Sequence, residues 1–189
     1  GISNGEEISY QSVSSDCGVS ANTVKNYIQI LEDTLIAFQL PAYTKTKQRK
    51  AISRSKLYFF DLGVTNTLAN RGEILDNSEL FGKAFEHFII LEVRAFLSYF
   101  RKKIKMSYWR SVSRFEVDLI LGEQWAIEIK SNSLVQPKHM KGLRALKEEG
   151  TIADYAVISR DSVERTTRDG IRIFPWKVFL KKLWQGEFI

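Results

Sequence analysis

Two acidic residues and a lysine stand in a stretch of the sequence that otherwise has the pattern of β-strands. Residues 115–121 and 125–130 each alternate with a period of two and are rich in β-branched and aromatic residues. In the first strand, Val117 and Ile120 are expected on opposite faces. The segment 122–124 between the strands contains a glycine, and a short glycine-containing break between two strands predicts a hairpin. We therefore expect a β-hairpin with a three-residue loop.

This loop length brings Asp118 opposite Glu128 on one face of the hairpin. Directly paired residues have Cβ atoms about 4.5–5.5 Å apart, a separation at which one divalent cation can bridge two carboxylates. Hard oxygen ligands favour Mg²⁺ or Mn²⁺, and Lys130 could hold a phosphate or an attacking water nearby. A two-residue loop would place Asp118 opposite Ile127 instead and break the site. The alternative is a solvated edge hairpin with an ordinary mixture of Glu and Lys.

A third carboxylate is expected from the helix that precedes the hairpin. Residues 79–100 predict a long helix, and Glu86 stands at the head of an apolar stripe that continues through Ile90, Val93 and Leu97. A carboxylate at that position is directed toward the surface on which the helix packs. The alternative is that Glu86 lies at the flank of the stripe and reaches water.

The N-terminal part has the pattern of a winged helix-turn-helix. A short helix over 10–17 ends at Gly18, and Ser20 is a good N-cap for a second helix reaching about residue 34. Two candidate strands follow, at 36–40 and 57–60. Helix, glycine turn, helix and a two-stranded wing is a common DNA-binding arrangement.

The loop between these two strands is strongly basic, because no acidic residue lies between Pro41 and Asp61. Such a wing suits contacts with nucleic-acid phosphates. The residues expected to make them are Lys45, Lys47, Arg49, Lys50, Arg54 and Lys56. Residues 1–43, in contrast, contain one basic residue, Lys25, and five acidic ones. The sequence therefore leaves two interpretations open: DNA contact led by the wing, or a protein-docking winged helix with a solvated wing.

Whole-chain properties narrow the functional classes. The net charge is +6, which favours a polyanionic partner. A single cysteine excludes an internal disulfide framework, and no apolar run is long enough to span a membrane. With no secretory signal pattern, we expect a cytoplasmic protein. Because the sequence contains no phosphate-binding loop of the Gly-x-x-x-x-Gly-Lys-[Ser/Thr] type, we expect no ATP hydrolysis by this chain alone.

The order of expected elements in the second part is helix, three strands, helix, strand. A strand at 104–110 precedes the hairpin, a helix at 137–149 follows it, and a strand lies at 155–159. A further strand at 171–174 and an amphipathic helix at 175–184 close the chain. The sequence thus predicts a mixed α/β protein with a winged-helix domain at 1–60 and an αβββαβ domain at 61–189.

The spacing of Asp118 and Glu128-x-Lys130 resembles motifs II and III of the PD-(D/E)xK nuclease superfamily, and Glu86 stands where that superfamily carries its motif I carboxylate. The chain as a whole resembles the C-terminal region of predicted bacterial and archaeal AAA-type ATPases. The segments that carry this second resemblance are Asn22-Thr23-Val24, Tyr27-Ile28, Leu31-Glu32-Asp33-Thr34, Tyr58-Phe59-Phe60-Asp61-Leu62-Gly63, Gly82-Lys83-Ala84-Phe85-Glu86, Tyr108-Trp109-Arg110, Glu116-Val117-Asp118 and Glu128-Ile129-Lys130.

These resemblances imply a restriction-endonuclease-like second domain in which Glu86, Asp118, Glu128 and Lys130 are catalytic and the three carboxylates hold Mg²⁺ or Mn²⁺. They also imply an ATPase module in the same full-length protein and nucleic acid, DNA in the first place, as partner. The alternative is a non-catalytic DNA- or protein-binding regulator of that ATPase, since such folds also serve as binding platforms. The sequence leaves the oligomeric state open.

Overall fold

The computed structural model describes residues 4–76 and 78–189. They form two compact units. The first contains the residues up to Pro41 together with Arg54–Glu73, and the second contains Ala42–Ser53 together with the residues from Ile74 onward. This division differs from the expected boundary at residue 60, because the part of the basic loop from Ala42 to Ser53 belongs to the second unit and residues 61–73 belong to the first.

The first unit begins with two helices, α1 (Tyr10–Cys17) and α2 (Ala21–Asp33). Helix α1 ends at Gly18, whose φ of 65° is the left-handed conformation that glycine adopts without strain. The Ser20 hydroxyl caps α2 by accepting a hydrogen bond from the backbone N–H of Thr23 at 3.0 Å. The predicted helices and the predicted cap are confirmed.

Two short antiparallel strands, β1 (Ala37–Leu40) and β2 (Lys56–Phe59), follow, and helix α3 (Leu62–Leu68) ends this unit. The Asp61 carboxylate caps α3 by accepting from the N–H of Val64 at 2.8 Å. The apolar faces of α2 and the hairpin bury one small core, which consists of Val24, Ile28, Ala37, Leu57 and Phe59.

The second unit is built on a six-stranded mixed sheet in the order β3-β4-β5-β6-β8-β7. Its strands are β3 (Met106–Arg110), β4 (Glu116–Leu121), β5 (Trp125–Lys130), β6 (Asp154–Ser159), β7 (Arg165–Thr166) and β8 (Arg172–Pro175). Strands β3 to β5 form an antiparallel meander, and β5, β6 and β8 run parallel. The edge strand β7, which has two residues and pairs antiparallel with β8, was not predicted because so short a segment shows no periodicity.

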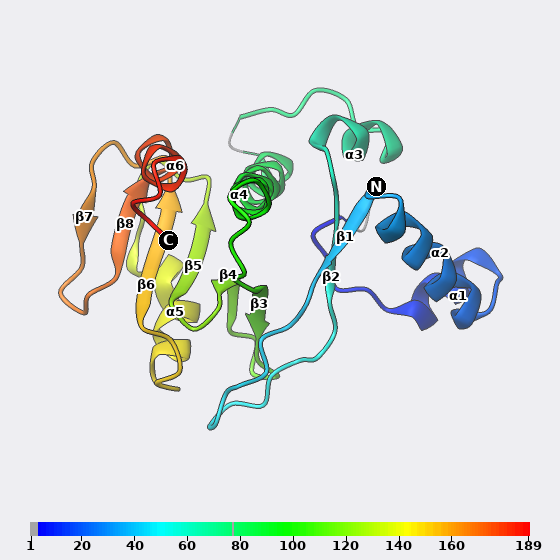
Figure 1. Ribbon diagram of the computed structural model, residues 1–189, viewed down its shortest axis with the longest axis horizontal. Helices are drawn as coiled ribbons and strands as arrows, with labels where there is room; N and C mark the ends of the chain where they lie inside the picture. Colours follow the sequence, from blue (N-terminus) through cyan, green and yellow to red (C-terminus); the bar gives the residue numbers. More distant parts are fainter. Residues whose placement is uncertain (1–3, 77) are drawn as a thin grey trace. The chain divides into compact units, whose positions relative to one another are not determined.

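Helices cover both faces of this sheet (Figure 1). Helix α4 (Glu79–Tyr99) and helix α6 (Trp176–Trp184) contact each other through aromatic rings. The opposite face packs on α5 (Lys141–Lys147), whose Leu143 and Leu146 share a core with β-strand residues such as Val157.

The helix predicted over 137–149 is divided in two. A 3₁₀ turn, η1 (Pro137–Met140), precedes α5, with Pro137 at its start as expected. Among the described residues, no helix combines the length and the apolar composition that crossing a bilayer requires.

Candidate functional site

Strand β4 contains a bulge at the candidate carboxylate. The register between β3 and β4 shifts between Ser107 and Trp109, so that one residue of β3 stands opposite two residues of β4, the first being Asp118. The extra residue reverses the alternation of side chains, and Val117 and Ile120 consequently lie in the same core. The prediction that these two residues face opposite sides of the strand was wrong, because strict alternation assumes a regular ladder.

The predicted hairpin register is confirmed from the loop as far as Leu119 and Ile127, whereas the direct pairing of Asp118 with Glu128 is not among the strand pairs of β4 and β5. The loop consists of three residues, Gly122–Gln124, and Leu121 pairs with Trp125 across it. Gly122 has a φ of 60°, a conformation that strains other residue types. Regular pairing continues to Leu119 and Ile127, so the next positions along the two strands are those of the two candidate carboxylates.

The strands leave regular pairing at this point. Asp118 Oδ2 accepts a hydrogen bond of 2.7 Å from the backbone N–H of Ile129, a donor that a ladder carbonyl would otherwise occupy. Asp118 is buried, with 5% of its surface exposed. The side chain therefore takes the place of a backbone acceptor and lies inside the open end of the hairpin.

Lys130 connects the two acidic side chains. Its Nζ lies 2.6 Å from Glu128 Oε1 and 3.7 Å from Asp118 Oδ2. Both carboxylate side chains are 8% exposed, whereas that of Lys130 is 31% exposed. The ammonium group thus partly neutralises a buried pair of carboxylates and also reaches the surface.

Glu128 has an oxygen that is not used. Its Oε2 is buried, and no group within residues 4–76 or 78–189 makes a hydrogen bond to it. Burial raises the pKa of Glu128 well above its ordinary value, and the charge of Asp118 raises it further, while Lys130 opposes both effects. Burial alone would lower the pKa of Lys130, but the charges of Asp118 and Glu128 outweigh this effect and raise it.

Glu86 lies near this pair but does not complete a cluster. It is half-buried on α4, and its charge contributes to raising the pKa of both Glu128 and Lys130. In the part of the chain that the structure describes, no group of three or more His, Cys, Asp or Glu residues is arranged to hold a metal ion. The donors nevertheless suit a hard cation, because a buried carboxylate oxygen without a partner is an available ligand.

The segment after Lys130 is fixed by a further buried acid, Asp161. Asp161 Oδ2 accepts from the N–H of Val135 at 2.8 Å and from the hydroxyl of Ser159 at 3.0 Å. Asp161 Oδ1 accepts from the guanidinium of Arg165 at 2.6 Å. These hydrogen bonds hold the loop that follows the site-forming strand β5 against the end of β6.

Helix α5 approaches β4 so closely that only glycine fits between them. A Cβ at Gly142 would lie 1.8 Å from the carbonyl oxygen of Glu116, far inside any permitted contact. Glu116 is two residues before Asp118, so this contact determines how α5 sits behind the site.

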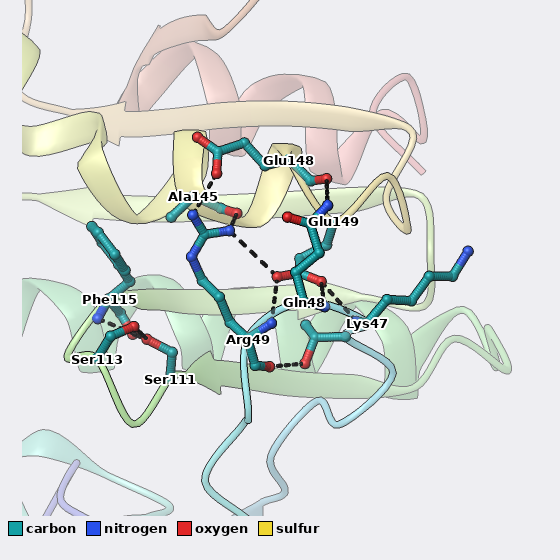
Figure 2. A network of polar contacts seen from close by, with 10 residues as sticks. Lys47, Gln48, Arg49, Ser111, Ser113, Phe115, Ala145, Glu148 and Glu149 are labelled. Atoms are coloured by element: carbon teal, nitrogen blue, oxygen red, sulfur yellow. Dashed lines mark hydrogen bonds and ion pairs between the residues drawn. The ribbon is translucent and has the colours of Figure 1, made fainter.

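The basic loop is anchored to the second unit by Glu149 (Figure 2). One carboxylate oxygen of Glu149 accepts from the backbone N–H groups of Lys47 and Gln48, both at 2.7 Å, and the other accepts from the N–H of Arg49 at 3.0 Å. The Arg49 guanidinium binds the same carboxylate at 3.4 Å, contacts Glu148 and lies over the ring of Phe115. Residues 47–49 of the basic loop are therefore held in place by the side chain of Glu149.

This anchoring divides the six residues expected to contact nucleic acid. Lys56 is buried in β2 at 4% exposure, and Arg49 is engaged by two glutamates, so neither is placed to contact phosphate. Lys45 forms an ion pair with Glu123 at 2.5 Å but remains exposed. The remaining three, Lys47, Lys50 and Arg54, are also exposed.

The anchoring acids Glu149 and Asp161 were missed by the reasoning from sequence. Each lies in a polar segment, after α5 or after β6, and nothing in its neighbours distinguishes it from a solvated acid. Their partners are backbone N–H groups, which every loop possesses, so no pattern of residue types could indicate them.

Comparisons with known proteins agree with the two-part organisation. Residues 3–74 match the family described as a domain of unknown function, DUF8612, and residues 81–179 match another domain of unknown function, DUF4143. An uncharacterized protein of Mycobacterium tuberculosis and one of Mycobacterium bovis are each 23% identical over 145 aligned residues, and each match covers 74% of this chain. The chain spans 32% of the length of these relatives. No solved structure matches the chain.

The DUF4143 match covers β3 to β6 entirely. It therefore includes Asp118, Glu128 and Lys130, which we call the carboxylate–lysine site. It extends over 99 of the 189 residues, counted from residue 81 to residue 179. The chain therefore belongs to the family of the domain of unknown function DUF4143.

Proposed function

We propose that the second unit is a divalent-metal-dependent nuclease-like module that acts on nucleic acid. The observation that carries this proposal is the unpartnered buried oxygen of Glu128 beside Asp118 and Lys130, where the hairpin opens. A buried acceptor without a donor is costly, and native sites that retain one commonly use it for a ligand or for chemistry.

The succession of elements supports a restriction-endonuclease-like fold for this unit. Helix α4, the meander β3 to β5, helix α5 and strand β6 follow one another in the αβββαβ order that the resemblance to PD-(D/E)xK nucleases implies. In the first unit, the helix pair and the β1–β2 hairpin support a winged helix. We further propose that both units form the C-terminal part of an AAA-type ATPase.

In this proposal Asp118 and Glu128 would hold Mg²⁺ or Mn²⁺, with Glu86 close enough for its charge to assist. The ion would polarise a phosphodiester and lower the pKa of a bound water. Lys130 would then no longer be needed to neutralise the carboxylates, and its ammonium, which is 31% exposed, could contact the phosphate instead. The burial of both acids would keep bulk water from competing for the cation.

A second candidate function is a non-catalytic regulator that binds nucleic acid or protein. The observation that favours it is the position of Lys130, which contacts both carboxylates and offsets part of their charge without a metal. A nuclease-like fold that has lost its cation would need another positive charge beside its buried carboxylates, and Lys130 provides one.

Plasmid cleavage tests the two functions against each other. Supercoiled DNA is incubated with the unmodified protein in Mn²⁺, with the unmodified protein in a chelator, and with the Glu128→Gln variant in Mn²⁺. This substitution keeps the size of the side chain but removes its charge. The nuclease proposal expects nicking by the unmodified protein in Mn²⁺ only.

A thermal measurement separates loss of chemistry from loss of fold. Mn²⁺ should raise the melting temperature of the unmodified protein by mass action and leave that of Asp118→Asn unchanged. If the protein neither nicks DNA nor responds to Mn²⁺, the carboxylates are not a metal site and the regulatory function stands.

A further inference from the structure

The C-terminal ends of α4 and α6 together display three large aromatic side chains to solvent. Tyr99 is 77% exposed, Phe100 is 47% exposed, and Trp184, the last residue of α6, is 39% exposed. Exposed large apolar side chains that gather in one place often mark a binding surface. We call these three residues the aromatic platform.

The rings of the platform support one another. The ring centroid of Trp184 lies 6.3 Å from that of Tyr99 and 6.2 Å from that of Phe100. Below them, the buried Phe96 meets Trp184 edge-on at 5.8 Å. The indole N–H of Trp184 donates to Glu92 Oε2 at 2.8 Å, which fixes the orientation of this ring. A platform held in this way loses little conformational entropy when a flat ligand stacks on it.

Four basic residues follow the platform directly along the chain. They are Arg101, Lys102, Lys103 and Lys105, and all four are exposed. Within the described residues none of them takes part in an ion pair with an acid. No acidic residue occurs between Glu92 and Glu116. Cations favour a helix C-terminus, but that effect is confined to the last turn, and Lys103 and Lys105 lie beyond it.

The basic run continues into a hollow of about 440 Å³. Lys103 and Lys105 line it from one side, and Lys45 of the basic loop lines it from another. One acid, Glu123, also lines this hollow and pairs with Lys45. The hollow shares Lys103 and Lys105 with the basic run, and the basic run follows Phe100 of the platform directly in the sequence. All three therefore lie around the segment of the second unit in which the chain passes from α4 into β3 (Figure 1).

We propose that this surface binds single-stranded nucleic acid, with bases stacked on Tyr99 and Trp184 and phosphates at the basic run. Exposed aromatic faces beside cations are the features with which proteins hold unpaired strands without sequence preference. In a duplex the base faces already stack on one another, so they are not accessible to the rings of the platform. The inference deepens the proposed function by naming its substrate class, and the step from binding to cleavage rests on that function.

The distance to the carboxylate–lysine site is compatible with this assignment. Glu86 and Tyr99 lie on the same helix, 13 residues apart, which corresponds to about 20 Å at the helical rise of 1.5 Å per residue. About six nucleotides cover this distance even at the 3.4 Å spacing of duplex DNA.

Fluorescence anisotropy with a labelled oligothymidylate of about 15 nucleotides tests the stacking. The titration is made with the full chain at low salt in a chelator, so that no cleavage can occur. Tyr99→Leu keeps an apolar side chain but removes the ring, and should weaken binding about tenfold. Tyr99→Phe keeps the ring and should bind like the unmodified protein. Tyr99 is largely exposed, so both variants are expected to fold.

The salt dependence tests the phosphate contacts. Replacing Lys102 and Lys103 with Ala should reduce the slope of log affinity against log salt by about 0.7 for each phosphate that the protein no longer neutralises. The matched control is Arg168→Ala, an exposed cation in the turn between β7 and β8.

The proposal is overturned if Tyr99→Leu binds as well as Tyr99→Phe, if the slope does not change, or if a duplex of the same length binds as tightly. Binding of an acidic protein at this surface with no affinity for the oligonucleotide would also overturn it. Because these titrations contain a chelator, binding without any cleavage in Mn²⁺ would refute the nuclease and leave this inference intact.

Discussion

Replacing Glu149 with glutamine should detach the basic loop from the second unit. The Glu149 side chain is fully buried, and its two carboxylate oxygens accept from three successive backbone N–H groups and from one guanidinium. Glutamine has the same size, but one of its terminal groups is an NH₂ donor. That group would face N–H donors in either orientation of the amide.

The expected loss follows from the number of hydrogen bonds. A hydrogen bond to a charged group contributes about 1.5–3 kcal/mol, and at least one donor is left buried without an acceptor. Two such losses amount to about 3–6 kcal/mol, close to the roughly 3–5 kcal/mol lost when a buried ion pair loses one partner. For a unit of this size the melting temperature should fall by about 10 °C. The neighbouring Glu148 provides the control, because its side chain is 57% exposed and its pairing with Arg49 is worth about 1 kcal/mol at most.

Two measurements check this prediction. Thermal unfolding gives the stability of the unmodified protein, Glu149→Gln and Glu148→Gln, and limited trypsin digestion reports the loop directly. A released loop should be cleaved after Lys47, Arg49 and Lys50 well below the unfolding temperature. Equal melting temperatures and equal cleavage rates for the two variants would refute the anchoring role.

The pH dependence gives the same prediction an independent check. Burial raises the pKa of Glu149, but hydrogen bonds from Gln48, Lys47 and Arg49 outweigh this effect and lower it below its ordinary value of 4.5. The folded state therefore binds this proton less tightly than the unfolded state. Its stabilising contribution is present above about pH 4.5 and disappears as the pH falls through the lowered pKa. The difference between the unmodified protein and Glu149→Gln should shrink accordingly in acid.

Two further predictions concern the surroundings of the site. Gly142→Ala should destabilise the second unit by at least about 3 kcal/mol in urea unfolding, because the new Cβ would lie 1.8 Å from a backbone oxygen. Gly82→Ala on α4, where a Cβ meets only the Ser131 hydroxyl at 3.6 Å, should instead stabilise by about 0.5–1 kcal/mol, and similar effects of both changes would contradict the packing described. Glu128→Gln should lessen the dependence of metal-free stability on pH, since the raised pKa of Glu128 makes the unmodified protein lose stability as pH rises from 4.5 toward that pKa. If the stabilities of the unmodified protein and of Glu128→Gln change in parallel between about pH 4.5 and 7, the pKa of Glu128 is not raised in the folded state.

The sequence by itself determined the local elements and the hairpin that carries the site. Capping residues such as Ser20 and Asp61 act on backbone groups three residues away, so the helix starts were readable from residue types. The register of Leu121 with Trp125 was readable because a three-residue loop allows only one pairing that keeps both apolar faces together.

Only the tertiary structure decided how the acidic and basic residues are used. Asp118 lies in a bulge that depends on the neighbouring strand β3, and Lys130 lies between two carboxylates whose separation regular pairing does not define. The composition of the basic loop indicated a wing exposed to solvent. Instead, the loop is held by Glu149, which lies 101 positions after Gln48 in the sequence. Local patterns report the interactions between residues near in sequence, whereas the desolvation and pairing of a charge depend on groups that only folding brings together.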